Sequence, residues 1–132
     1  MRRAIFLITG VMASGKSTVS QLLAERIEKS VHLRGDVFRR MIISGRAEMS
    51  AQPSEEAISQ LHLRYRLAAD AAKTYYESGF SVVLQDNFYG AELPEMVNLL
   101  KGYPVNVIVF CPSVETVKER EKMPNKAGYV GF

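Results

Sequence analysis

Four short apolar runs along the chain alternate with segments of helical periodicity. The runs are Ala4 to Thr9, Val31 to Arg34, Ser81 to Gln85 and Val105 to Phe110. All but the second are nearly continuous in Ile, Val, Leu and Phe, which is typical of strands that are buried on both faces of a sheet. Strands that alternate with helices predict an α/β fold with a parallel sheet.

Apolar residues three and four positions apart predict the helices between these strands. One such stripe lies in Ser17 to Lys29, and a longer helix should begin after the N-cap residue Ser54 and end at Gly79. The apolar face of this longer helix is Ile58, Leu61, Tyr65, Ala68, Ala72 and Tyr75. Shorter helices are expected at Val37 to Ser44, Pro94 to Lys101 and Val114 to Lys122, with a polar loop from Ser44 to Pro53.

The composition is that of one ordinary folded domain. The chain has 132 residues, of which 47% are hydrophobic and 23% charged, so it is neither disordered nor fibrous. The formal net charge is only +3, so a nucleic-acid partner is permitted but not indicated. Cys111 is the single cysteine and cannot form an internal disulfide, which favours a reducing, cytoplasmic setting. No apolar run approaches the ~20 residues that would span a bilayer, so no membrane partner is expected.

The most specific pattern lies directly after the first predicted strand. Residues 10–17 read GVMASGKS and match G-x-x-x-x-G-K-[ST], a loop whose backbone N–H groups cradle phosphates. Lys16 would reach the β- and γ-phosphates of ATP, and the Ser17 hydroxyl would bind Mg²⁺. The competing interpretation is a glycine-rich turn with a solvated lysine. The predicted nucleotide-binding residues are Gly10, Ala13, Ser14, Gly15, Lys16, Ser17 and Thr18.

Two of the three aspartates follow predicted strands. Asp36 and Asp86 each come just past a strand's carboxyl end, at the sheet edge where open α/β folds bind ligands. Asp86 is the candidate metal ligand beside Ser17, with a helix or turn cap as the alternative. Asp36 is placed to accept a proton from a substrate hydroxyl, and its alternative is a helix N-cap with a surface ion pair.

The basic residues and the histidines give weaker signals. Arg120, among Lys118, Lys122 and Lys126, is the best candidate to close over a transferred phosphoryl group, unless this stretch is a solvated helix face. Arg64 and Arg66 point different ways on the long helix, so at most one faces the site. His32 and His62 have no other metal ligands at suitable spacing along the chain, so no zinc site is expected.

With these features in view, the chain resembles the small P-loop kinases. It is most similar to the chloramphenicol phosphotransferase-like group, with gluconate kinases, adenylylsulfate kinases and zeta-toxin-like kinases as relatives. The stretch RGDVFRR, residues 34–40, is similar to the G-D-x-x-R segment after the second strand of these kinases. The resemblance implies a three-layer P-loop NTPase fold, ATP and Mg²⁺ as cofactors, Asp36 as the base, and Arg39 or Arg40 as residues that hold the acceptor.

The length departs from this resemblance. Such kinases have five parallel strands, whereas only four strands are visible in this sequence. We therefore expect residues 1–132 to form a single P-loop kinase-like domain that lacks its C-terminal strand. The last strand, Val105 to Phe110, would then be an exposed apolar edge through which the protein self-associates.

Three functions follow from these features. The first is an ATP-dependent kinase that moves the γ-phosphoryl group to a hydroxyl of a small-molecule acceptor. The second is a nucleotide-binding module without transferase activity, and the third is a nucleotide or polynucleotide kinase. The acceptor pocket would be shaped by Phe38, Arg39, Met41, the loop from Ser44 to Pro53, Tyr65 and Phe88.

Overall fold

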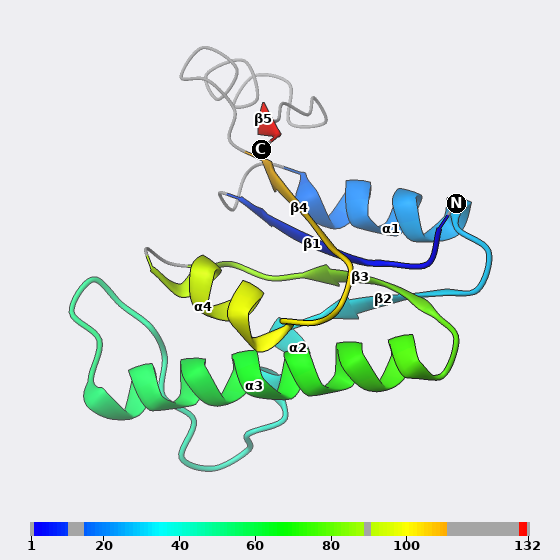
Figure 1. Ribbon diagram of the computed structural model, residues 1–132. Coiled ribbons are helices and arrows are strands. Elements are labelled where there is room, and N and C mark those ends of the chain that lie inside the picture. Colours follow the sequence, from blue (N-terminus) through cyan, green and yellow to red (C-terminus); the bar gives the residue numbers. More distant parts are fainter. Residues whose placement is uncertain (1, 11–14, 89–90, 111–129, 132) are drawn as a thin grey trace.

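A computed structural model describes residues 2–10, 15–88, 91–110 and 130–131, in which strands and helices alternate (Figure 1). The strands are β1 (Ile5–Gly10), β2 (Ser30–Arg34), β3 (Ser81–Gln85), β4 (Val105–Phe110) and β5 (Val130–Gly131). The helices are α1 (Lys16–Arg26), α2 (Asp36–Arg40), α3 (Glu55–Glu77) and α4 (Glu92–Leu99). The predictions of β3 and β4 are confirmed to the residue. The helix predicted at Val37 to Ser44 ends four residues earlier than expected, at Arg40. The helix predicted at 114–122 lies outside the described residues.

The strands form one sheet in the order β2-β3-β1-β4-β5. The first four are parallel to one another, which confirms the predicted α/β fold with a parallel sheet. β2 lies at one edge, and none of its residues is fully buried. This position explains why its sequence is the least apolar of the four, because an edge strand remains partly open to solvent.

The sequence predicts an open outer edge at β4, but the structure pairs part of this edge. The two-residue strand β5 pairs with it in antiparallel fashion, joining Val130 to Val109 and Gly131 to Ile108. No fifth parallel strand is found in the described part of the chain. The predicted open edge is therefore paired at its carboxyl end, and self-association through the remainder stays a prediction.

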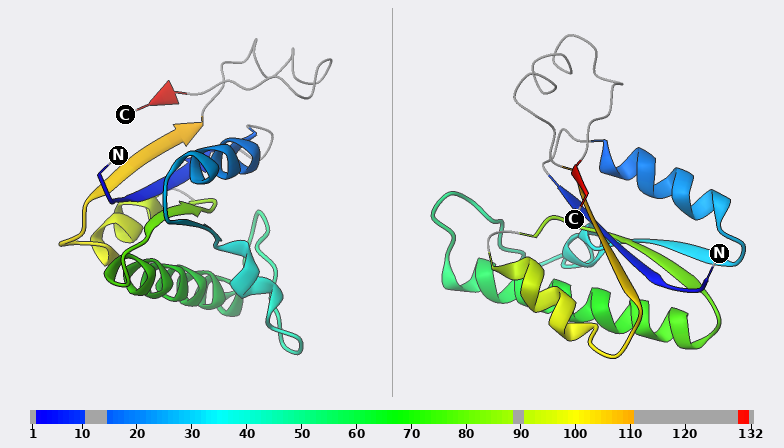
Figure 2. Two further views of the ribbon diagram at one scale, coloured as in Figure 1. Left: turned by 90° about the vertical axis from the view of Figure 1, so that its right-hand side faces the viewer. Right: turned by 45° about the horizontal axis from the view of Figure 1, so that its top comes forward.

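Helices cover both faces of the sheet. α1 lies on one face, and α3 and α4 lie on the other (Figure 2). Side chains alternate along β1 because successive residues of a strand point to opposite faces. Ile5 and Leu7 belong to the larger core cluster with α3 and α4, whereas Ile8 belongs to a smaller cluster with Ala24 of α1. Among the described residues, none of the helices combines the length and the apolar character that a membrane span requires.

The buried faces of α1 and α3 differ from the predicted apolar stripes. In α1 the buried residues are Lys16, Ser20 and Ala24. Leu22, an apolar residue of the helix predicted at Ser17 to Lys29, is 49% exposed. α3 begins after the N-cap Ser54, as predicted. Its predicted apolar face, however, is wrong at both ends. Ile58 and Tyr75 are 38% and 42% exposed. Alanines form the buried face of α3 together with Leu61 and Tyr65, and apolar side chains that lie off this face remain at the surface.

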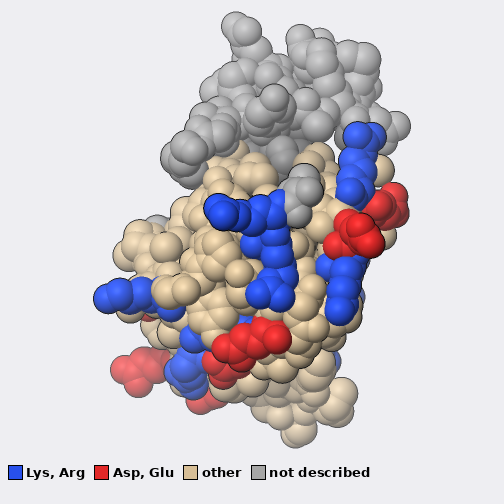
Figure 3. All heavy atoms as spheres, turned by 45° about the vertical axis from the view of Figure 1, so that its right-hand side comes forward, with Lys and Arg blue, Asp and Glu red and all other residues tan. Residues whose placement is uncertain are grey.

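Charges of both signs are mixed on the surface. On the face drawn in Figure 3, acidic side chains lie among the basic ones, and they interrupt any continuous basic track there. This agrees with a formal net charge of only +3.

Candidate active site

The two glycines on either side of the segment 11–14 have the backbone that the sequence motif predicts. Gly10 has a φ of 148° and Gly15 a φ of 81°, both in a range that residues with a Cβ rarely adopt. α1 begins at Lys16, directly after Gly15, and has no acidic residue in its first turn. The free N–H groups of this first turn, which includes Ser17 and Thr18, make the helix start suited to an anion. Ala13 and Ser14 lie outside the described residues.

Lys16 is buried beside a carboxylate. Only 8% of the residue is exposed, and this burial lowers its pKa, while the nearby charge of Asp86 acts in the opposite direction. A buried ammonium group next to the positive end of a helix is costly in the absence of an anion. This environment is therefore suited to a bound phosphate.

The two strand-end aspartates are neighbours at this edge of the sheet. Arg34 pairs with Gln85 in the register of β2 and β3, so the residues that follow them are also adjacent. The Gly35 N–H donates to the Gln85 carbonyl at 2.9 Å. A Cβ built on Gly35 would overlap the carboxylate of Asp86, so glycine is required here for close approach.

Asp86 is almost fully buried and is held by Arg64. The Arg64 Nε donates to Asp86 Oδ2 at 3.0 Å, and the Arg64 Nη2 donates to Asp86 Oδ1. Asp86 Oδ1 also accepts from the Asn87 backbone N–H at 2.7 Å. Burial raises the pKa of Asp86, and the guanidinium of Arg64 opposes this shift. Three of the roughly four lone-pair sites of a carboxylate are therefore used within the protein.

Asp36 is the first residue of α2 and sits among three arginines. It accepts from Arg39 Nε and from Arg40 Nε, both at 2.8 Å, and Arg64 Nη1 lies 3.7 Å from its Oδ1. The hydrogen bond from Arg39 is the main reason why the pKa of Asp36 is lowered. The N-cap of α2 is Gly35, so the alternative prediction that Asp36 is the N-cap is wrong. The ion pairs that this alternative also predicted for Asp36 are present.

Arg64 joins the two aspartates. Its side chain is 10% exposed, and it contacts Asp86 and Asp36 at once. Arg66, two positions further along α3, is exposed, which confirms that at most one of these arginines faces the site. Periodicity alone did not choose between them. The signal that identifies Arg64 is its position four residues before Ala68 and eight before Ala72, on the face of α3 that is buried against the sheet.

A cavity of about 410 Å³ opens next to Asp36, between α2, the segment 41–54 and α3. Phe38, Arg39 and Met41 line it, as predicted, together with residues 47–49 of the predicted loop. Tyr65 and Phe88, also predicted to shape the pocket, are not among its lining residues. Their rings pack against each other instead, with centroids 5.0 Å apart.

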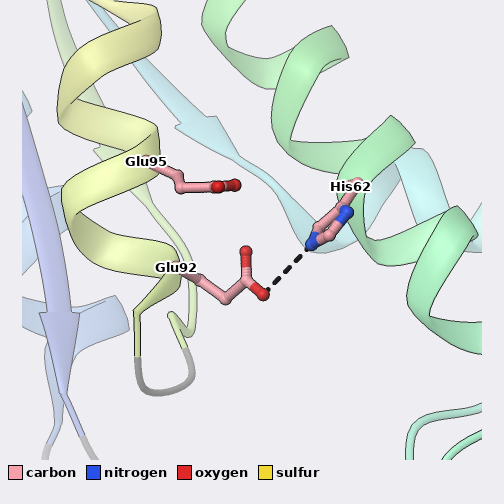
Figure 4. A group of neighbouring side chains, drawn as sticks. All are labelled: His62, Glu92 and Glu95. Atoms are coloured by element: carbon pink, nitrogen blue, oxygen red, sulfur yellow. Dashed lines mark hydrogen bonds and ion pairs between the residues drawn. The ribbon is translucent and has the colours of Figure 1, made fainter.

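A second polar cluster lies between α3 and α4. His62 Nε2 is 3.0 Å from Glu92 Oε1, and the ligand atoms of His62, Glu92 and Glu95 all lie within 4.8 Å of one another (Figure 4). Sequence spacing gave no sign of this group, because the chain separates His62 from Glu92 by 30 positions. Folding thus gives His62 the carboxylate neighbours that its local sequence lacks.

The predicted basic lid cannot be placed. Cys111, Lys118, Arg120, Lys122 and Lys126 all lie outside the described residues.

Comparison with known proteins identifies the family. Residues 5–130 match AAA_33, described as an AAA domain. The chain belongs to this family. No curated protein matches its sequence.

Solved structures with this fold include kinases. A sugar kinase from Janibacter sp. HTCC2649 has a TM-score of 0.64 and 16% identity, over 97% of this chain and 70% of that one. A candidate kinase from Chloroflexus aurantiacus J-10-fl has a TM-score of 0.55 and 26% identity, over 93% and 68%. A chain of the Pnkp1/Rnl/Hen1 RNA repair complex has a TM-score of 0.65 and 19% identity, over 98% and 41%. The AAA_33 domain is thus a kinase-like nucleotide-binding module, and the comparisons do not single out the chloramphenicol phosphotransferase-like group.

Proposed function

We propose that this domain is an ATP-dependent kinase that transfers the γ-phosphoryl group to a hydroxyl of a small molecule. One observation carries the proposal: Asp36 lines a cavity of about 410 Å³ and is linked through Arg64 to Asp86, which lies next to Lys16. A phosphate-binding helix start and a partly open acceptor cavity therefore lie at the same edge of the sheet. This is where open α/β folds bind their ligands.

The proposed reaction is a direct displacement. The acceptor oxygen forms a bond to the γ-phosphorus while the bond from that phosphorus to the β–γ bridging oxygen breaks, and ADP leaves. The hydroxyl proton passes to the carboxylate of Asp36. Lys16 and the first turn of α1 bind the phosphates and offset their charge, so the protein contributes mainly positioning and electrostatics.

The lowered pKa of Asp36 defines its part in this reaction. The pKa falls because Arg39 donates a hydrogen bond to the carboxylate, so Asp36 is ionised at neutral pH. A carboxylate of this kind is a weak base. It orients the hydroxyl through a hydrogen bond and accepts the proton late, once the new oxygen–phosphorus bond has made that proton acidic.

The residues near Lys16 fit a magnesium ion. The Ser17 hydroxyl and the Asp86 carboxylate are oxygen donors, which Mg²⁺ prefers. Since Arg64 and Asn87 already use most of the Asp86 lone pairs, we propose that Asp86 holds the ion through water molecules. When bound, Mg²⁺ neutralises charge on the β- and γ-phosphates.

The main alternative is a module that binds ATP without transferring phosphate. A polynucleotide kinase has one observation in its favour, the similarity in fold to a chain of an RNA repair complex. The formal net charge of only +3 does not by itself indicate a nucleic-acid partner.

The variant Asp36→Asn tests the proposal, with Asp70→Asn as its control. Asp70 is an exposed aspartate on α3 and lies outside the cavity lining. We expect Asp36→Asn to bind Mg·ATP like the wild type in calorimetry while acceptor-dependent ADP production falls at least about 100-fold. Asp70→Asn should retain both. Equal turnover in the two variants would remove Asp36 from the reaction.

A further inference from the structure

We infer that the phosphoryl acceptor is an uncharged alcohol with an apolar carbon body, bound between α2, the segment 41–54 and α3. This inference rests on the proposed function and specifies its substrate class. It depends on three properties of the cavity described above: its charges are paired, the amide of Gln60 is already used by the protein, and its remaining walls are apolar.

The charges that line the cavity balance one another. Two carboxylates, Asp36 and Glu48, face two guanidinium groups, Arg39 and Arg64. Arg39 donates to Asp36 at 2.8 Å and to the two Glu48 oxygens at 2.9 and 2.8 Å. A carboxylate or phosphate on the acceptor would compete with Asp36 and Glu48 for the guanidinium groups and would lie close to their like charge. An uncharged acceptor avoids that penalty.

The amide of Gln60 also serves the protein itself. Its Oε1 accepts from the Ala47 backbone N–H at 2.8 Å, and its Nε2 donates to the Gly45 carbonyl and to Glu56, each at 2.8 Å. Gln60 therefore ties the segment 41–54 to α3 and has little capacity left for a ligand. A sugar, which needs a partner for each of several hydroxyls, would find few here.

One polar atom at the cavity has no partner within the protein. Asn87 belongs to the lining, and its Oδ1 is buried without a hydrogen bond in the described structure. An acceptor with one or two polar groups would be satisfied by Asp36 and Asn87. These two partners suffice for an alcohol that has one further hydrogen-bond donor, but they are too few for a polyol.

The rest of the lining is apolar and partly open. Its larger apolar side chains include Phe38, Met41, Met49, Leu61, Leu63 and Leu67. Met41 is 61% exposed, Leu63 38% and Leu67 40%, so a ligand would cover apolar surface that now faces solvent. The volume of about 410 Å³ lies within the range of roughly 300–1,000 Å³ that is usual for small-molecule sites.

The inferred geometry also places the reacting atom. The carbon body lies against α3 and the segment 41–54, and the hydroxyl lies at Asp36. There the alcohol oxygen bonds to the γ-phosphorus, ADP leaves with the bridging oxygen, and Asp36 takes the hydroxyl proton. The products are a phosphate monoester and ADP.

The test measures binding without ATP, so that it does not depend on transfer. Saturation-transfer NMR on the full chain would use four probes: phenylalkanols, hexoses, hydroxy acids and a 5′-hydroxyl oligonucleotide. The cavity variant is Leu67→Gln, and the control is Leu22→Gln, which changes a similarly exposed leucine on α1. We expect binding of phenylalkanols only, about fivefold weaker in Leu67→Gln and unchanged in Leu22→Gln.

The possible results separate the two proposals. Binding of hexoses, hydroxy acids or the oligonucleotide in place of phenylalkanols overturns the inferred substrate class, whether or not the protein is a kinase. Absence of binding by every probe, or equal binding by both leucine variants, overturns it as well. If phenylalkanols bind as expected but Mg·ATP never phosphorylates them, the cavity inference stands and the kinase proposal fails.

Discussion

The pair formed by Arg64 and Asp86 allows a quantitative prediction. Their side chains are 10% and 2% exposed, and two hydrogen bonds join them. Removing one partner of a buried ion pair typically costs about 3–5 kcal/mol, because the other charge is left buried. In Arg64→Met, Asp86 would keep the Asn87 N–H and the nearby charge of Lys16. We therefore expect a loss at the lower end of this range, about 3 kcal/mol in the free energy of unfolding at pH 7.

The double variant Arg64→Met/Asp86→Asn tests whether the unpaired charge of Asp86 causes this loss of stability. Without the carboxylate no buried charge is orphaned, so the double variant should recover at least about half of the loss. The measurement is urea denaturation followed by far-ultraviolet circular dichroism for the wild type, both single variants and the double variant. A loss below about 1 kcal/mol in Arg64→Met, or no recovery in the double variant, would refute the reasoning.

The loss of stability in the single variant Arg64→Met should depend on pH. Burial already raises the pKa of Asp86, and loss of Arg64 removes the main opposing influence, so the pKa rises further. A group whose pKa is higher in the folded state than in the unfolded state loses stabilisation as the pH rises through the folded pKa. The stability deficit of Arg64→Met should thus be greatest at neutral and alkaline pH and should shrink as the pH falls.

Three further variants follow from contacts at the site. Gly35 has a φ of −60°, which alanine adopts readily, so Gly35→Ala isolates the overlap with Asp86 and should destabilise the fold by about 1–3 kcal/mol while slowing transfer. Arg39→Gln removes the main cause of the lowered pKa of Asp36, so the acid limb of the kcat/KM profile should move to higher pH. Gln60→Ala frees the segment 41–54 and should raise the KM for the acceptor while the KM for ATP stays unchanged.

Matched controls exist for two of these variants. Arg26→Gln changes an exposed arginine in the last turn of α1 and should leave the pH profile in place. Gln52→Ala changes an exposed glutamine in the segment 41–54 that lies outside the cavity lining. The assignments are contradicted by an unmoved acid limb in Arg39→Gln, by an acceptor KM that is equal in the two glutamine variants, or by wild-type stability in Gly35→Ala.

The parts of the structure that the sequence predicts well are those set by local rules. Gly10 and Gly15 adopt positive φ because the turn before α1 requires it, and Ser54 caps α3 because its side chain accepts from the Ala57 N–H at 3.1 Å. β3 is buried except at Gln85, and β4 is largely apolar although its described side chains are only partly buried. Turn residues precede both strands, so their bounds could be read directly.

The parts that it predicts poorly depend on contacts between distant segments. Rotation of α3 about its axis is set by its alanines against the sheet, which is why Arg64 is buried and Ile58 is exposed. The cluster of His62 with Glu92 forms only when α4 packs beside α3. Pairing of β5 with β4 likewise joins segments that are distant along the chain, and two residues are too few to show a strand pattern.

The most direct test of the central claim follows the fate of the γ-phosphoryl group. The wild-type protein would be incubated with Mg²⁺, ATP labelled with ¹⁸O on its γ-phosphate and the alcohol panel, and the products would be read by mass spectrometry. We predict one labelled phosphate monoester of the alcohol for each ADP formed. Label found only in inorganic phosphate, or no ADP with any acceptor, would contradict the assignment of this site as a kinase.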